Sequence, residues 1–199
     1  MPDRLPTTSE ATDEELISLF QHGNEAAFTQ LVSRFKNPLM NFVFRYTGDR
    51  DDAEEIVQET FVKLFRNRHA YRPIAKFSTW LYTVAGNLAR TALRRKKRGT
   101  VLSIFRRRSD DTGGDYEIPD TRYSSERDAE ESFRTEMIQK ALLSLEEIHR
   151  EIVILSDIQE LSYEEITQIT GLKMGTVKSR LNRARAELRV LLKDVRDDL

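Results

Sequence analysis

The 199-residue sequence predicts an all-α protein built from two small helical domains that a flexible linker joins. Hydrophobic residues recur at helical spacing along most of the chain, and no alternating strand pattern persists. Residues 99–125 are instead rich in Asp, Gly, Ser, Thr and Arg, which is typical of a linker. We therefore expect a disordered N-terminus over residues 1–11 and domains over 12–98 and 126–199, each large enough for its own core.

The N-terminal domain is expected to contain four helices. Thr12 and Glu15 form a capping box at the start of the first helix, which Gly23 ends. The other three helices start near Asn24, Asp51 and Ser78, and the last of them reaches the basic cluster at 94–98.

The C-terminal domain is expected to hold two helices followed by a helix-turn-helix over 161–188. Ser162 and Glu165 form a second capping box, and Gly171 suits the tight turn because glycine enters the left-handed conformation at no steric cost. The second helix of this motif has an inward stripe that includes Val177 and Leu181.

The outward face of that second helix is polar and cationic. Hydroxyl, amide and guanidinium groups read base edges, while cations at the borders of such a face hold phosphates. An ordinary surface hairpin is the alternative, but the turn glycine and the near absence of acids favour DNA recognition. The predicted DNA-binding residues are Thr176, Lys178, Ser179, Arg180, Asn182 and Arg183.

A second candidate surface lies on the fourth helix, where Trp80, Asn87, Arg90 and Arg94 fall on one side. An aromatic ring beside an amide and guanidinium groups suits unstacked bases and their backbone. The alternative places Trp80 half-buried against the third helix.

The segment from Asp49 to Glu59 is mostly acidic. Acids in a first helical turn are favoured by the helix dipole, and a solvated face is the simplest alternative. A basic protein partner is the functional interpretation, for which the candidates are Asp52, Glu55, Gln58 and Glu59.

Several protein classes are excluded. The chain has no cysteine, and its His22, His69 and His149 lack metal-type spacing. Nucleophile and phosphate-loop motifs are missing, so we expect neither an enzyme nor a cofactor or metal site. Without a signal segment or a membrane span, the sequence predicts a cytoplasmic protein that makes no membrane contact of its own.

Four blocks occur in a characteristic order: DAEEIVQETFVKLFR (52–66), FSTWLYTVAGNLAR (77–90), LSYEEITQITGL (161–172) and GTVKSRLNRARAEL (175–188). Together they resemble the extracytoplasmic-function (ECF) sigma factors of bacterial RNA polymerase. The resemblance implies that 12–98 is sigma region 2, which melts and reads the promoter −10 element, and that the second domain is region 4, which reads the −35 element. It also implies that the linker threads through core RNA polymerase.

The resemblance assigns −35 recognition to the residues predicted on the second helix of the helix-turn-helix, and polymerase binding to those of the acidic segment. For the −10 element it implies a base pocket at Asn87 and the loop 71–76, which departs from the family's F-R-G pattern. Lys173-Met174 also departs from the commoner proline-containing turn. The full −10 set is Tyr71, Arg72, Ile74, Lys76, Phe77, Trp80, Asn87, Arg90 and Arg94.

The implied partners are promoter DNA, core RNA polymerase and a separate anti-sigma protein. One rival interpretation is a one-component regulator that binds duplex operator DNA by itself. Another is a helical adaptor that binds only protein, which leaves the cationic face from Lys178 to Arg183 without a role.

Overall fold

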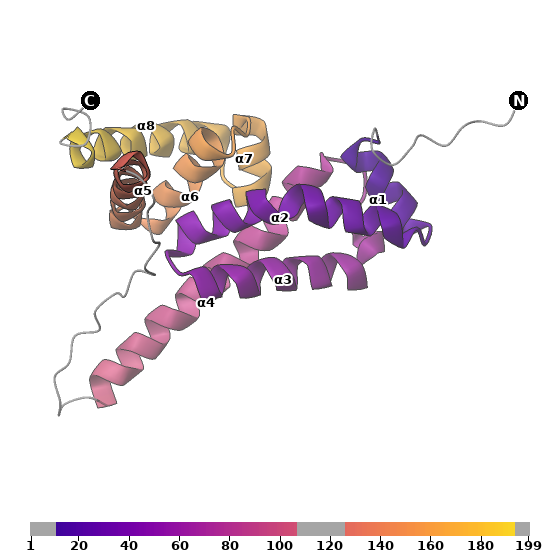
Figure 1. The fold of residues 1–199 in the computed structure, drawn as a ribbon, viewed down its shortest axis with the longest axis horizontal. Coiled ribbons are helices and arrows are strands. Elements are labelled where there is room, and N and C mark those ends of the chain that lie inside the picture. Colours follow the sequence, from indigo (N-terminus) through magenta and orange to yellow (C-terminus); the bar gives the residue numbers. More distant parts are fainter. Residues whose placement is uncertain (1–10, 107–125, 194–199) are drawn as a thin grey trace, which may run out of the picture.

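The computed structural model describes residues 11–106 and 126–193, and in these two ranges every regular element is a helix (Figure 1). The elements are α1 (Asp13–Gln21), α2 (Glu25–Thr47), α3 (Arg50–Arg66), η1 (Arg68–Ala70), α4 (Phe77–Arg106), α5 (Glu126–Ser144), α6 (Glu147–Val153), η2 (Ile154–Ile158), α7 (Tyr163–Thr170) and α8 (Met174–Leu191).

Side-chain caps begin helices α1, α2 and α3. The Oγ1 of Thr12 accepts a hydrogen bond from the Glu15 backbone N–H, and the Glu15 carboxylate accepts one from the Thr12 backbone N–H, so the predicted capping box is confirmed. Asn24 caps α2, and Asp49 caps α3 by accepting from two backbone N–H groups. Helices α2 and α3 lie side by side, and α4 packs against both.

The helix-turn-helix also forms as predicted. Ser162 and Glu165 make the second capping box, and Gly171 ends α7 with a φ of 72°. That backbone conformation is strained for residues with a Cβ, which is why a glycine stands at the turn. Helix α8 follows after Leu172 and Lys173 and packs against α6 and α7.

Two predicted boundaries differ from the structure. Helix α4 runs to Arg106, past the expected start of the linker at Gly99, because one glycine costs a helix only about 1 kcal/mol. Ala11, assigned to the disordered N-terminus, is buried, and its carbonyl accepts a hydrogen bond from Arg34 at 2.7 Å. Residues 1–10 and 107–125 lie outside the described part of the chain, and with them most of the predicted linker.

The expectation of two separate cores is wrong. Buried residues of both domains form one hydrophobic cluster, in which Phe42 and Tyr82 belong with Leu142 and Ile152. Helix α7 packs on α4, while α5 and α6 pack on the C-terminal half of α2 (Figure 1). The sequence prediction missed this because each stripe was assigned to a core within its own domain.

Within the described ranges, no helix is long and apolar enough to cross a membrane. The same residues contain no cluster of histidine and acidic side chains that is suited to a metal ion.

Candidate nucleic-acid and polymerase interfaces

Helix α8 separates a buried stripe from an exposed polar face. Val177, Leu181 and Ala184 are buried, as predicted. On the other side, Lys178, Ser179, Asn182 and Arg183 are exposed, and Thr176 and Arg180 are half-buried. The packing of α8 on α6 and α7 therefore leaves the six predicted DNA-binding residues on the solvent side of the motif or at its edge.

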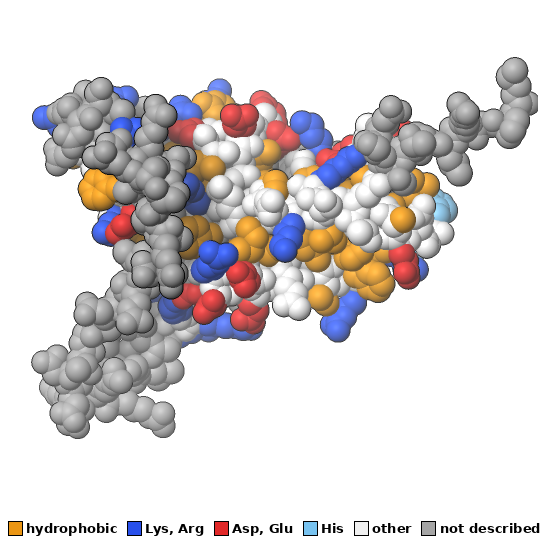
Figure 2. Space-filling view, in the orientation of Figure 1, with side chains coloured by type: hydrophobic (Ala, Val, Ile, Leu, Met, Phe, Trp, Pro, Cys, Tyr) orange, Lys and Arg blue, Asp and Glu red, His pale blue; other side chains and the backbone are white. Residues whose placement is uncertain are grey.

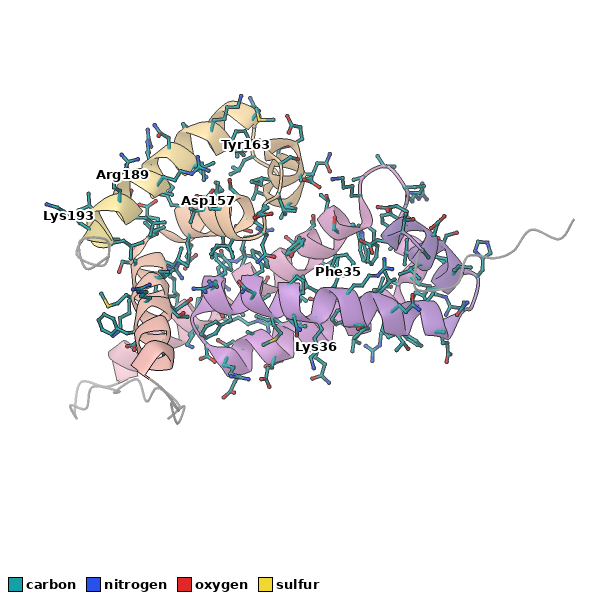
Figure 3. All side chains as sticks on the ribbon, turned by 45° about the horizontal axis from the view of Figure 1, so that its top comes forward. Phe35, Lys36, Asp157, Tyr163, Arg189 and Lys193 are labelled. Carbon is teal, nitrogen blue, oxygen red and sulfur yellow. The ribbon has the colours of Figure 1, made fainter. Side chains whose placement is uncertain are left out.

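Arg185 has a role that the sequence did not reveal. Its guanidinium forms a two-pronged ion pair with Asp157, with distances of 2.9 and 2.6 Å, which ties α8 to the end of η2. Burial raises the pKa of Asp157, but hydrogen bonds from Arg185 and Ser156 outweigh it and hold the pKa below the usual value. In Figure 3, Asp157 lies beneath α8, whereas Arg189 and Lys193 lie along its outer side.

The loop before α4 combines an exposed rim with an aromatic floor. Arg72, Ile74 and Lys76 are exposed, as a contact surface requires. Tyr71 and Phe77, which were also predicted to contact DNA, are instead buried at 5% and 0% exposure. They have a supporting role, because aromatic side chains this far from solvent stabilise the loop by packing and present no surface to a ligand.

Trp80 packs against the buried rings of Tyr71 and Phe77, which together form the aromatic floor of the loop. Its ring centroid is 6.1 Å from that of Phe77 and 6.1 Å from that of Tyr71. The Tyr71 hydroxyl donates a hydrogen bond to the Ala75 carbonyl at 2.9 Å, which holds the loop in a tight curve. Trp80 is half-buried, as the alternative interpretation expected, but its aromatic contacts are with the loop side of α4 rather than with α3.

Farther along α4, the candidate polar residues are connected to one another. Arg90 Nη2 donates to Asn87 Oδ1 at 2.8 Å, and Arg94 Nε donates to the Arg90 carbonyl at 3.3 Å. Asn87 and Arg94 are exposed. Arg90 also forms an ion pair with Glu151 of α6 through its Nη1, so one of its two terminal nitrogens contacts the C-terminal domain.

The acidic segment divides into two groups. Asp49 and Asp52 accept hydrogen bonds from Lys96 at 2.9 and 3.4 Å, and the Lys96 hydrogen bond is the main cause of a lowered pKa at Asp49. The predicted partner residue Asp52 thus has a structural contact. Glu55 and Gln58 are exposed, and Glu59 Oε1 lies 3.8 Å from Lys63 Nζ, one helical turn farther along α3.

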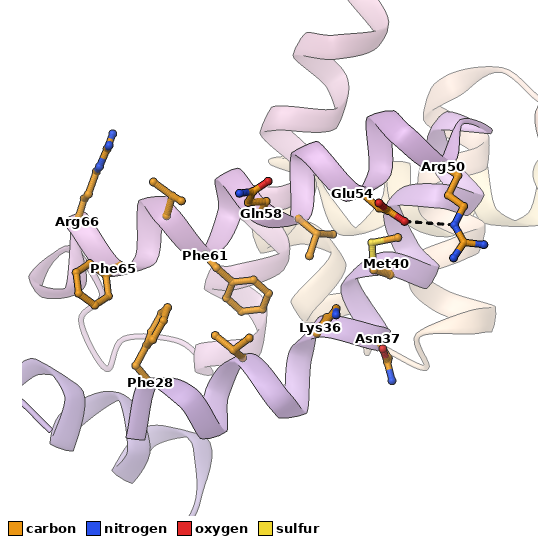
Figure 4. A pocket seen from close by; sticks show the side chains of 13 residues that line it. Phe28, Lys36, Asn37, Met40, Arg50, Glu54, Gln58, Phe61, Phe65 and Arg66 are labelled. Carbon is orange, nitrogen blue, oxygen red and sulfur yellow. Dashed lines mark hydrogen bonds and ion pairs between the residues drawn. The ribbon is translucent and has the colours of Figure 1, made fainter. Parts of the chain in front are cut away.

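An apolar groove runs between α2 and α3 beside these acids. Phe28 of α2 and Phe61 of α3 line it, with Gln58 at its edge, as Figure 4 shows. Phe65, also in the groove, is 44% exposed, which is high for such a side chain. Figure 2 shows hydrophobic side chains gathered over this groove and acidic ones over the beginning of α3. The sequence prediction assigned these apolar residues to the core and so missed the groove.

Comparisons with known proteins identify the family of this chain. The Sigma-70 region 2 family matches residues 31–99, and the Sigma-70 region 4 family matches residues 135–188. The chain is 32% identical over 187 residues to the ECF RNA polymerase sigma factor SigW of Bacillus subtilis, covering 90% of this chain and 96% of SigW. The chain belongs to the ECF sigma factors of the sigma-70 family. The ECF sigma-E factor of Haemophilus influenzae is similarly related, with 32% identity over 177 residues that cover 87% of this chain and 92% of that protein.

Two solved structures share the fold. The sigma factor RpoE of Bartonella quintana, in complex with the anti-sigma factor NepR, matches with a TM-score of 0.64 at 27% identity, covering 83% of this chain and 96% of that one. The structure of CnrH in complex with the cytosolic domain of CnrY has a TM-score of 0.67 at 24% identity and covers 92% and 97% of the two chains. In this ECF sigma factor, the N-terminal domain corresponds to region 2 and the C-terminal domain to region 4.

Proposed function

We propose that this ECF sigma factor directs core RNA polymerase to its promoters through three separate surfaces. Helix α8 of region 4 reads the −35 element, α4 and the loop before it read the −10 element, and α3 binds the polymerase. A factor with these partners works beside the chromosome, in the cytoplasm. The main support is that the exposed cationic face of α8 belongs to a chain whose two family matches are sigma regions 2 and 4.

The −35 assignment rests on the chemistry of α8. Lys178 and Arg183 supply donors that suit guanine edges, Asn182 has an amide that suits adenine, and each well-placed contact of this kind contributes about 1–3 kcal/mol. Arg180 lies at the border of the face, where a phosphate contact fits.

The −10 assignment rests on α4 and its loop. Trp80 has a partly open aromatic face over a rigid floor, and stacking contributes roughly 1–3 kcal/mol per unstacked base. Asn87 lies two helical turns away with its amide exposed, where it suits hydrogen bonding to a base edge. The exposed Arg72 and Lys76 border the site and suit the backbone phosphates.

The polymerase assignment rests on α3 and the groove beside it. Gln58, Phe61 and Phe65 line the groove, whereas Glu55 and Glu59 lie beside Gln58 on α3 and do not line it. The charged lining of the groove is the acid Glu54 and the cations Lys36, Arg50 and Arg66, so the groove itself suits the apolar side of a partner helix. Glu55 and Glu59, on the neighbouring face of α3, suit basic residues of the same partner. We assign core RNA polymerase to this surface, in contact with both the acids and the groove.

An anti-sigma protein is the fourth proposed partner. The Bartonella quintana relative was solved in complex with an anti-sigma factor, and at 27% identity it shares this chain's fold. A separate protein of this type would restrain this factor until its inducing signal arrives.

Transcription reconstituted from the purified chain and the host's core polymerase on a library of randomised promoters tests the proposal. We expect start sites that share one −35 and one −10 sequence. Glu55→Lys and Glu59→Lys should weaken binding to core polymerase by roughly tenfold, because each reverses a charge at the interface. Glu25→Lys, which reverses an exposed acid at the start of α2, is the matched control. Equal polymerase binding by all three variants would remove α3 from this role.

A further inference from the structure

The contact between regions 2 and 4 is strongly polarised in charge. Lys76 pairs with Glu165 at 3.0 Å, Lys97 pairs with Glu147 at 2.7 Å, and Arg90 pairs with Glu151. In each of these pairs the cation belongs to region 2 and the acid to region 4. The acids of region 4 thus lie against cations that region 2 would otherwise offer to DNA.

Glu151 is the central residue of this contact. Its side chain is fully buried, and its Oε2 has no hydrogen-bond partner. Gly86 of α4 makes room for it, since a Cβ at that position would lie 3.2 Å from Glu151 Oε1. Glycine inside a helix is unfavourable by about 1 kcal/mol relative to alanine, so helix stability does not account for Gly86. Its effect is to form a notch in α4 that admits the carboxyl of Glu151.

In the notch, the carboxyl of Glu151 is shielded from water. Burial raises the pKa of Glu151 to about 7, although the Arg90 guanidinium acts in the opposite direction. Groups from three elements face this carboxyl: Arg90 from α4, Tyr46 from α2 and Glu147 from α6. A buried acid on one domain, aimed at a notch in the other, is a costly feature for a simple packing contact.

Closure occupies part of the proposed −10 surface. Arg90 is held between Glu151 and Asn87 Oδ1, and Lys76 is paired with Glu165. A compact chain of this length has a radius of gyration of roughly 16 Å, whereas DNA elements two helical turns apart are separated by about 70 Å. The closed molecule is therefore too compact to reach both promoter elements, even though the −35 face of α8 remains exposed.

We propose that the filled Gly86 notch and the ion pairs Lys76–Glu165 and Lys97–Glu147 form an intramolecular latch, which holds the free factor closed with region 4 acids on the −10 surface. The factor must open at this contact before it binds the −10 element. The inference that the latch blocks −10 recognition rests on the proposed function. The closed packing of region 4 on region 2 does not.

A wedge variant tests the latch. Gly86→Leu places a side chain in the notch, where the nearest atoms belong to Glu151 and to the flexible Arg90 side chain rather than to the region 2 backbone. Overpacking of this kind should shift the equilibrium toward the open form by about tenfold or more. Glu151→Ala combined with Gly86→Leu vacates the space that the leucine needs, so the double variant should close again. Arg95→Leu adds the same side chain at an exposed position of α4 and serves as the control.

Opening is measured as the distance between spin labels on Ser33→Cys of α2 and Gln168→Cys of α7. Both positions are exposed, and the native chain has no cysteine that would take up a label. We expect one narrow distance for the parent, for Arg95→Leu and for the double variant. Gly86→Leu should give a broad, longer distribution, with a far-UV spectrum that still shows folded helices.

Binding of a single-stranded oligonucleotide carrying the −10 sequence from the selected promoters gives the second readout. Gly86→Leu should bind it about tenfold more tightly than the parent, and the double variant should return to the parent value. A narrow, unchanged distance in Gly86→Leu would overturn the latch while leaving promoter-directed transcription intact. Opening without any gain in −10 binding would also overturn the latch, because closure would then not cover the residues that bind the −10 element. Loss of transcription by the parent chain would instead overturn the proposed function and leave the distance measurements standing.

Discussion

Arg150 is the clearest case of a single residue that joins several parts of the molecule. Its guanidinium donates to the carbonyl of Tyr46 at 2.8 Å and to those of Leu143 and Leu145 at 2.9 and 3.0 Å. These carbonyls lie near the ends of α2 and α5, where helices leave acceptors without partners. One buried cation therefore provides hydrogen-bond donors for the backbone carbonyls at the ends of two helices from different domains.

Replacing Arg150 by alanine should lower the free energy of unfolding by roughly 3 kcal/mol, because buried carbonyls lose charged donors. For a protein of this size, that corresponds to a fall of about 10 °C in the melting temperature. Differential scanning calorimetry measures both quantities. Arg134→Ala, which removes an exposed cation of α5, should leave the melting temperature within about 1 °C. Equal melting of the two variants would show that these hydrogen bonds contribute little.

Lys178→Ala and Arg183→Ala should each reduce transcription from the cognate promoter by roughly tenfold, as expected for a lost base contact. Both side chains are exposed, so the circular dichroism spectrum should not change. Lys178 Nζ lies 5.9 Å from the centroid of the Tyr163 ring, an exposed contact of about 0.5–1 kcal/mol, so Lys178→Ala should lower the melting temperature by no more than about 3 °C. Run-off transcription gives the rate. Lys193→Ala removes a cation beyond the end of α8 and is the matched control. A double variant as active as Lys193→Ala would exclude α8 as the −35 reader.

At the level of elements, local signals predicted the structure well. The boxes Thr12–Glu15 and Ser162–Glu165 join residues only three positions apart, so their hydrogen bonds follow from the sequence itself. The left-handed turn at Gly171 is local in the same sense, as is the polar face of α8. The sequence therefore predicted most helices and the solvent side of α8.

Long-range packing was not predictable in this way. Arg90 and Glu151 are 61 residues apart, and no local pattern marks them as a pair. Phe77 was part of the −10 set that the family resemblance implied, but an aromatic residue serves equally well as a buried packing residue and as a stacking surface. Periodicity shows that a residue faces inward, and it does not show against which element it packs.

The loop before α4 should determine −10 preference independently of α8. Exchanging residues 72–76 for the corresponding residues of a related factor should change the −10 sequence recovered from randomised promoters and leave the −35 sequence unchanged. The exposed Arg72 and Ile74 make this loop the most accessible part of the proposed site. The swap should keep Tyr71 as the floor residue, so that folding is preserved. Identical −10 sequences from both loops would contradict the assignment.

On the scale of the whole molecule, closure should depend on pH through Glu151. The pKa of Glu151 is about 7 when the carboxyl is buried and 4.5 in its ordinary state, so the closed form binds the proton more tightly. Closure is therefore strongest below pH 4.5, weakens as pH rises through 7, and is constant above that. Between pH 8 and pH 5.5 the ratio of closed to open molecules should rise roughly 20-fold.

The spin-label distances measure this ratio directly. Glu151→Gln keeps an uncharged group of the same size in the notch, so it should stay closed at both pH values and lose most of the pH dependence. A parent chain and a Glu151→Gln variant with the same pH response would show that another group titrates at the contact.

The central claim is that this chain reads promoters only as part of RNA polymerase, and a mobility-shift titration on its promoter duplex tests it most directly. The net charge of −1 gives little overall attraction to phosphate, and the closed form pairs Lys76 and Arg90 with acids of its own. We predict weak binding by the free chain at physiological salt and tight, sequence-specific binding once core polymerase is added. Tight, sequence-specific binding by the free chain, unchanged by core polymerase, would contradict the account and favour a one-component regulator.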